Sequence, residues 1–173
     1  DPNDVRLLTY KDLFESVCKL SNGLKSLGVK KGDRVTIYLP MIPEAAVAML
    51  ACSRIGAIHS VVFGGFSPDS LRNRVLDCKS SVIITANEGI RGGKKIPLLS
   101  NVKKSIENTE IVNKIVVVKR TESKEFFDPA KDYWYHDLVS NQKKECEPTP
   151  QSSEDPLFIL YTSGSTGAPK GVL

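Results

Sequence analysis

A loop near the last residue of the sequence combines residue types that bind phosphate. It contains hydroxyl side chains and glycines in one unbroken run, followed by a lysine: Thr162, Ser163, Gly164, Ser165, Thr166, Gly167 and then Lys170. Glycines allow successive backbone N–H groups to converge on an anion, hydroxyls add donors, and the lysine neutralises charge. The pattern predicts a phosphate-binding loop. The alternative, a flexible tail rich in serine and glycine, is disfavoured by the apolar strand predicted just before it.

This loop differs from a Walker A loop, which has the pattern G-x-x-x-x-G-K-[ST]. Counting from Gly164, that pattern requires a glycine at position 169, where the sequence has Pro169. Proline also prevents a helix from following at once, and a Walker A loop relies on the N-terminus of such a helix. We therefore expect the loop alone to hold the phosphate.

A second candidate for anion binding is a short basic turn. Gly92 and Gly93 separate Arg91 from Lys94, shortly after the apolar stretch 81–86. Ligands of open α/β sheets bind beyond the carboxyl ends of the strands. A guanidinium fork beside an ammonium group suits a phosphate. An ordinary solvated turn explains the same residues equally well, so the local sequence leaves both interpretations open.

A third candidate lies at the end of the apolar stretch 57–63. Gly64 and Gly65 would allow a flat ring of a ligand to approach the backbone, with Phe63 and Phe66 on either side. From the local sequence alone, structural turn glycines with core aromatic residues are the favoured interpretation.

Metal and nucleophilic sites have little support in the sequence. The cysteines, Cys18, Cys52, Cys78 and Cys146, show no C-x-x-C spacing, and the histidines are His59 and His136. This composition argues against a zinc site, and we interpret Cys18 and Cys52 as reduced core residues. The sequence has no G-x-S-x-G motif. Because His59 lies in an apolar strand, we interpret it as a hydrogen-bonded core histidine.

The composition is that of an ordinary globular domain. The chain has 173 residues, of which 40% are hydrophobic and 25% charged, with a net charge of +4. The mild charge and scattered lysines argue against a nucleic-acid partner. No apolar run approaches the ~18 residues of a membrane helix. The first residues also lack the pattern of a signal peptide.

Stretches with the period of strands alternate with stretches of helical period. Strands are predicted at 7–10, 34–40, 57–63, 81–86, 114–119 and 155–162. Helices are predicted at 10–28, 44–56, 68–80 and 97–108. Short strands that are apolar on both faces and separated by helices are typical of a parallel sheet. We predict a three-layer α/β fold with a mostly parallel sheet and helices on both faces.

The chain divides into three predicted segments. Residues 1–119 form an α/β subdomain. Residues 120–155 form a long polar excursion with a short helix near 132–140, which packs Trp134 on the main body. Residues 156–173 contain a returning buried strand and the phosphate-binding loop.

The segment ILYTSGSTGAPKG resembles the AMP-binding signature of the adenylate-forming superfamily, which includes acyl-CoA synthetases, luciferases and the adenylation domains of peptide synthetases. Ala168 occupies a position of the motif that tolerates variation. Residues 39–98 resemble the acetyl-CoA synthetases, and SEDPLFILYTSGSTGAPKGV resembles their fungal members in particular. The resemblance is weakest over 108–152. It implies a ligase that forms acetyl-adenylate and diphosphate from acetate and MgATP, and then transfers the acetyl group to CoA.

The resemblance also implies roles for the three candidate segments. The loop from Thr162 to Gly167, with Lys170, would bind the β- and γ-phosphates of ATP. The turn Arg91, Gly92, Gly93 and Lys94 would bind the CoA nucleotide and its 3′-phosphate, and Phe63, Gly64 and Gly65 would form the wall beside its adenine. No catalytic residue and no metal ligand is expected in this chain.

In this family the acetate pocket, the adenine-binding segment, the ribose-binding aspartate and the adenylation lysine lie C-terminal to the motif. We therefore expect a fragment of the large N-terminal domain that is inactive alone. The parent enzyme is expected to use ATP with Mg, CoA and acetate, to bind neither nucleic acid nor membranes, to form a homo-oligomer, and to occupy the cytoplasm and the nucleus. Two alternatives stay open: a synthetase for propionate or another acid, and a non-catalytic module that binds CoA or a nucleotide.

Overall fold

The computed structural model describes residues 5–123, 126–162 and 169–173. Within them, a seven-stranded sheet has the order β7-β6-β3-β1-β2-β8-β9. Neighbouring strands are parallel except β8 and β9, which pair antiparallel. The strands are β1 (Arg34–Tyr38), β2 (Ile58–Val61), β3 (Val82–Ala86), β6 (Lys114–Val118), β7 (Asp132–Trp134), β8 (Phe158–Thr162) and β9 (Lys170–Val172). The predicted, mostly parallel sheet is confirmed.

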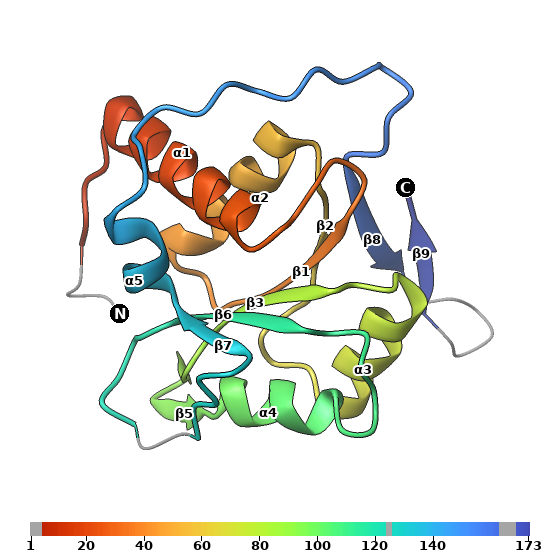
Figure 1. Ribbon diagram of the computed structural model, residues 1–173. Coiled ribbons are helices and arrows are strands. Elements are labelled where there is room, and N and C mark those ends of the chain that lie inside the picture. The colour runs from red at the N-terminus through yellow and green to blue at the C-terminus, as the bar shows by residue number, and fades with distance from the viewer. Residues whose placement is uncertain (1–4, 124–125, 163–168) are drawn as a thin grey trace.

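Helices cover both faces of the sheet (Figure 1). One face carries α1 (Tyr10–Ser26), α2 (Pro43–Ile55) and α5 (Tyr135–Ser140), and the other carries α3 (Pro68–Asp77) and α4 (Leu98–Ser105). The central strands require this double cover, because every residue of β3 is buried. The three-layer arrangement is therefore as predicted. None of the helices in the described ranges is both long enough and apolar enough to cross a bilayer.

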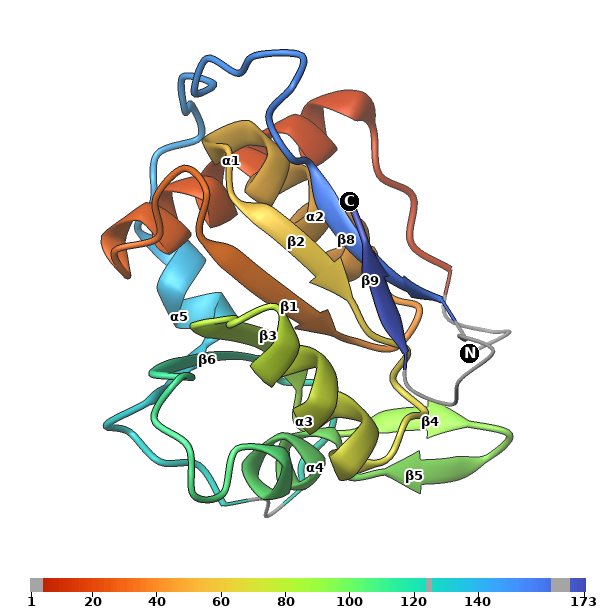
Figure 2. The ribbon, with the colours of Figure 1, turned by 90° about the vertical axis from the view of Figure 1, so that its right-hand side faces the viewer.

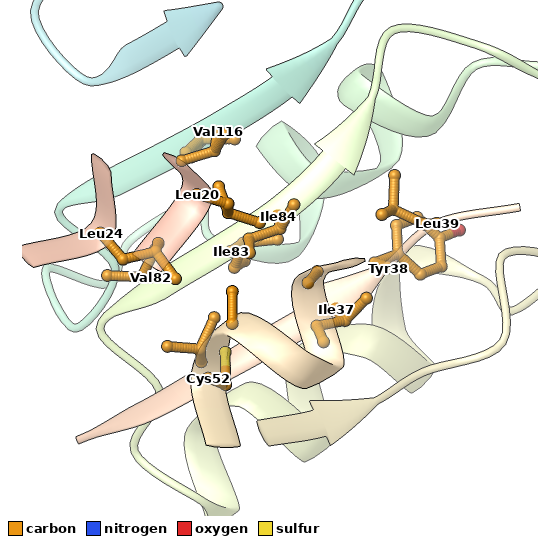
Figure 3. Close-up of a cluster of buried hydrophobic side chains, with 14 of the residues drawn as sticks. Leu20, Leu24, Ile37, Tyr38, Leu39, Cys52, Val82, Ile83, Ile84 and Val116 are labelled. Carbon is orange, nitrogen blue, oxygen red and sulfur yellow. The ribbon is translucent and has the colours of Figure 1, made fainter. Parts of the chain in front are cut away.

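Side chains of α1 and α2 pack against side chains of the central strands (Figure 3). Leu20 of α1, Cys52 of α2 and Ile83 of β3 are fully buried. Burial raises the pKa of the Cys52 thiol to about 12, so the group stays protonated and unreactive at neutral pH. Cys18 is equally buried, and both thiols are free. The interpretation of these two cysteines as reduced core residues is confirmed.

The first helix begins earlier than a strand at 7–10 would allow. Thr9 is its N-cap and forms a capping box with Asp12, in which each residue's side chain accepts a hydrogen bond from the other's backbone N–H. Leu7 is 94% exposed and pairs with no strand of the described chain. The predicted strand is therefore wrong. The T-x-x-D spacing was the signal that identifies a helix start here.

The polar excursion contains α5 within its expected span and also β7, which the sequence pattern did not predict. β7 extends the parallel sheet beyond β6. Its buried Asp132 carboxylate lies 2.6 Å from the Nζ atom of Lys103, which satisfies the charge. Trp134 stacks on Phe127 at 4.4 Å and packs against the core, as expected. β7 was missed because its three residues are polar and aromatic instead of aliphatic.

After α5 the chain passes over α1 and α2 before it reaches β8 (Figure 1). We call residues 141–157 the crossing segment. Asn22 of α1 donates a hydrogen bond to the carbonyl of Glu145 at 2.9 Å. Arg54 of α2 donates one to the carbonyl of Cys146 at 2.6 Å. The crossing segment is therefore bonded to both helices.

β8 is not the buried strand that the sequence predicted. Its residues alternate between exposed and half-buried positions. β8 pairs with β2 through two residue pairs and with β9 on its other side. β8 lies next to the edge strand β9, away from the centre of the sheet. Its apolar composition alone could not reveal this.

Candidate functional site

A pocket of about 550 Å³ lies where several strands of the sheet end. Its lining includes residues after β1, β2, β3 and β6, with Leu160 of β8. Parallel strands present their carboxyl ends at one edge of the sheet, so residues distant in sequence meet there. Phe63, Gly64, Gly65 and Arg91 all line this pocket. The structure thus joins two of the candidate segments into one site.

Two glycines of the pocket wall leave little room for a side chain. A Cβ atom on Gly64 would lie 3.1 Å from the backbone oxygen of Leu39, at the end of β1. A Cβ atom on Gly65 would lie 2.5 Å from the ring of Phe63 and 2.8 Å from the guanidinium of Arg91. Gly64 therefore has a structural reason to be glycine, as the local sequence indicated. Gly65 has a reason that concerns the pocket, since a side chain there would displace two lining residues.

The basic turn is the tip of a β-hairpin (Figure 2), and residues of both hairpin strands line the pocket. Its strands are β4 (Gly89–Arg91) and β5 (Lys94–Ile96), which pair antiparallel. Gly92 and Gly93 form the two-residue turn with φ values of 54° and 75°, which favour glycine. Arg91 and Lys94 are directly paired across the hairpin, so their side chains lie on one face.

Arg91 connects the hairpin to the pocket wall. Its guanidinium lies 4.9 Å from the centroid of the Phe63 ring, in a cation–π contact. The Phe63 ring in turn meets Phe66 edge to face at 5.6 Å. Lys94 is exposed and does not line the pocket. The structure therefore places Arg91 inside the site and the other three residues of the turn at its rim.

The predicted phosphate-binding loop lies largely outside the described residues, which exclude Ser163, Gly164, Ser165, Thr166 and Gly167. Its two ends are described. Thr162 of β8 and Lys170 of β9 are direct partners in the antiparallel pair. Directly opposed residues of such a pair lie on the same face of the sheet.

The face on which Thr162 lies can be identified from its own strand. Side chains alternate along a strand, so Thr162 lies on the same face of β8 as Leu160. Leu160 lines the pocket. Both ends of the loop therefore lie on the face of the sheet that carries Leu160, a residue of the pocket lining. The sequence pattern alone did not indicate that the two ends would be paired.

Several residues that shape the site were missed by the sequence analysis. Asn87, directly after β3, is 2% exposed. Its Oδ1 atom accepts hydrogen bonds from the backbone N–H groups of Arg120 at 2.8 Å and Glu88 at 2.9 Å. Its Nδ2 atom donates to the carbonyl of Thr121 at 2.7 Å. Asn87 thus joins the loops after β3 and β6, and a polar residue directly after a buried strand was the available signal.

Arg74 and Tyr161 were also missed. Arg74 of α3 is 8% exposed, and its guanidinium lies 4.6 Å from the Phe66 ring and 5.4 Å from the Tyr161 ring. The Tyr161 hydroxyl donates to Asp77 at 2.7 Å. Burial and this carboxylate raise the pKa of Tyr161 well above its usual range, so the hydroxyl remains a donor. No local pattern in the sequence indicated that these residues meet.

His59 is a buried histidine, as predicted, but the hydrogen bond predicted for its ring is not found at Nδ1. It is 8% exposed, and its ring lies 5.8 Å from that of Phe158. Its Nδ1 atom has no hydrogen-bond partner among the described residues. Burial lowers the pKa of His59, which favours the neutral ring. His59 is therefore placed as a neutral residue of the core.

Comparison with known proteins gives consistent matches along the whole chain. The acetyl-coenzyme A synthetase of Mesorhizobium japonicum is 60% identical over 177 aligned positions, which cover 100% of this chain and 27% of that protein. The acetyl-coenzyme A synthetase of Bradyrhizobium diazoefficiens is 61% identical, again over 100% of this chain and 27% of that protein. The chain therefore spans about a quarter of the length of these relatives.

A solved structure shows the same arrangement of elements. The crystal structure of an acyl-CoA synthetase from Brucella canis matches with a TM-score of 0.79 and 27% identity, over 99% of this chain and 28% of that one. The family model described as AMP-binding enzyme matches residues 3–173. Because this match extends over nearly the whole chain, the protein belongs to the family of AMP-binding enzymes.

Proposed function

We propose that this chain forms part of an acetate–CoA ligase that produces AMP. The reaction joins acetate to the α-phosphate of ATP, which releases diphosphate, and the thiol of CoA then displaces AMP from the acetyl-adenylate. The observation that carries the proposal is the identity of about 60% to acetyl-coenzyme A synthetases along the whole chain. The structural match to an acyl-CoA synthetase supports the same class of reaction.

In this proposal, the loop between β8 and β9 holds the β- and γ-phosphates of ATP. The paired ends of the loop, Thr162 and Lys170, support this role, since a hydroxyl and an ammonium group then lie on one face. The leaving diphosphate carries concentrated negative charge. A cation and several hydrogen-bond donors fixed beside it stabilise that charge as it develops.

The pocket between β2 and the β4–β5 hairpin holds the nucleotide part of CoA. The cationic pair at the hairpin tip, Arg91 and Lys94, suits a phosphate monoester such as the 3′-phosphate of CoA. Gly64, Gly65 and the ring of Phe63 offer a flat, apolar wall to the adenine. Binding here orients CoA and leaves the thiol chemistry to other parts of the enzyme.

Acetate and magnesium are not assigned to residues of this chain. The relatives are nearly four times longer than the chain, so we propose that the acid pocket lies in the remainder of the enzyme. Among the described residues, no group of three or more His, Cys, Asp or Glu side chains is placed to hold a metal. Mg²⁺ is commonly held through substrate phosphates and few carboxylates, so we propose that it enters with ATP.

Exchange of labelled diphosphate into ATP tests the proposal on the full-length protein. We expect exchange to depend on a short carboxylic acid and to be fastest with acetate among acetate, propionate and butyrate. Addition of CoA should then yield the thioester and AMP in equal amounts. Exchange that is faster with propionate would assign a different acid, and the absence of exchange with every acid would contradict the proposal.

A further inference from the structure

Arg74 has an unusual environment for a buried arginine. No carboxylate of the described residues lies within 4.0 Å of its guanidinium. One terminal nitrogen donates to the carbonyl of Ser70 at 2.7 Å and to its hydroxyl at 3.3 Å. The remaining positive charge faces the rings of Phe66 and Tyr161. Two aromatic faces thus replace the counter-ion that a buried cation ordinarily needs.

The two rings belong to the two parts of the site. Phe66 lies just after Gly64 and Gly65, and its ring contacts Phe63. Its carbonyl also accepts a hydrogen bond from Tyr38 at 2.7 Å, which fixes this turn to the end of β1. A displacement of Phe66 would therefore also displace Phe63 in the pocket wall. Through Phe63 it would affect the position of the Arg91 guanidinium.

Tyr161 belongs to the phosphate-binding side. It directly precedes Thr162, the last residue of β8. Its hydroxyl donates to Asp77, at the end of the same helix that carries Arg74. One turn of α3 thus holds the Tyr161 side chain at two points, by the Arg74 guanidinium over the ring and by the Asp77 carboxylate at the hydroxyl.

We propose that Arg74 is a positioning residue that fixes the start of the phosphate-binding loop relative to the CoA pocket, by stacking between Phe66 and Tyr161. The proposal rests on the function proposed above. Arg74 touches neither substrate. It sets the distance between two sites on different strands, and a reaction in two steps at one centre requires both nucleotides in defined places. The stack supplies this connection across the surface of the sheet.

The neighbouring Arg72 provides a matched control. It lies on the same helix, and its guanidinium donates to the carbonyls of Ser105 at 3.2 Å and Glu107 at 2.6 Å. Arg72→Met removes an arginine that stabilises packing of α3 but touches no ring of the stack. Arg74→Met removes the stacked cation and keeps a long apolar side chain. Arg74→Lys keeps a cation that can face the rings.

Two sets of kinetic constants on the full-length protein test the proposal. Diphosphate exchange gives the KM for ATP, and thioester formation gives the KM for CoA. We expect Arg74→Met to raise both constants about tenfold, with a smaller change in kcat, and Arg74→Lys to recover most of the loss. Arg72→Met should lower the melting temperature and leave both constants within about twofold of the parent. Equal changes in the KM for ATP and the KM for CoA in Arg74→Met and Arg72→Met would overturn the proposal.

Hydrogen exchange provides a measurement that does not depend on activity. Backbone amides of residues 61–67 and of β8 should exchange faster in Arg74→Met than in Arg72→Met, because only the first variant loses the stack. If no acid supports diphosphate exchange, the proposed function fails. The hydrogen-exchange comparison of the two variants still tests whether Arg74 connects the two segments. If residues 61–67 and β8 show the same hydrogen exchange in both variants, the positioning role of Arg74 is overturned, even in an active enzyme.

Discussion

Thr162 and Lys170 are direct partners across the antiparallel pair of β8 and β9. The run of hydroxyl and glycine residues therefore begins and ends at one point of the sheet. Such a closed loop loses less conformational entropy when it surrounds an anion than an open segment would. The pairing also places the lysine beside the hydroxyl instead of at a distant position in space. This relationship makes the ammonium group of Lys170 the first target for mutation.

Replacement of Lys170 by methionine should slow diphosphate exchange by about 10²-fold, because a charge-stabilising group at the leaving diphosphate is lost. The KM for CoA should change little, since the hairpin residues remain. Lys104→Met, which alters an exposed lysine of α4, serves as the control for loss of charge alone. If the Lys170→Met enzyme exchanged diphosphate at the normal rate, the assignment of the loop to the ATP site would be wrong.

Replacement of Arg91 and Lys94 together by methionine should raise the KM for CoA by about 10- to 100-fold, because two charge-assisted contacts to a phosphate are lost. Diphosphate exchange without CoA should stay close to normal. Dephospho-CoA, which lacks the 3′-phosphate, should bind the unsubstituted enzyme and the double variant with almost equal affinity.

The same hairpin offers a control for this double variant. Lys95 is the neighbour of Lys94 on β5, so its side chain points to the opposite face, where it pairs with Glu88 at 3.4 Å. Lys95→Met should leave the KM for CoA unchanged. If Lys95→Met raised the KM for CoA as much as the double variant does, CoA would be attracted by the overall positive charge of the hairpin and not by a specific phosphate site.

The two glycines of the pocket wall should respond differently to alanine. Gly64→Ala sets a methyl group against the fixed backbone of Leu39, so we expect a loss of about 1–3 kcal/mol in the free energy of unfolding. Gly65→Ala meets side chains that can move, so stability should fall less. The displaced rings should instead raise the KM for CoA. Chemical denaturation and CoA titration of both variants separate these outcomes.

Acid should destabilise the fold in part through His59. Burial lowers its pKa below the ordinary value of 6.5, so the unfolded chain binds this proton more readily than the folded one. The contribution to stability is complete above pH 6.5 and is lost as the pH falls toward the folded pKa. Urea midpoints at pH 7 and pH 5 for the parent and for His59→Phe should show a smaller loss in the variant. An identical loss would mean that the folded state accommodates the charged ring.

Periodicity in the sequence was sufficient to predict the central sheet and four of its helices. It succeeded where burial is nearly complete, as in β3, or where a cap is explicit, as at Ser67 before α3. It missed β7, which has no aliphatic residue, and it predicted the strand β8 correctly but its burial wrongly. The place of each strand in the sheet order, and not its composition, decides that β7 forms and that β8 stays exposed.

The candidate site was predicted in part. The motif resemblance selected Phe63, Gly64, Gly65 and Arg91, and the structure brings these four into one pocket. The roles of these residues toward ATP and CoA, the three-segment division, the likeness to fungal enzymes, and the location in the cytoplasm and nucleus stay predictions. Arg74 could not be predicted, because its partners come from segments on both sides of it in the sequence.

The crossing segment has a consequence for the kinetics of folding. The chain forms β7 at one edge of the sheet and must then reach β8 near the opposite edge. β8 finds its partner β2 about a hundred positions earlier in the sequence. Contacts of such long range form late, because their loop-closure entropy must be overcome first. We therefore expect β8 and its partner β9 to be the last parts of the sheet to assemble during synthesis.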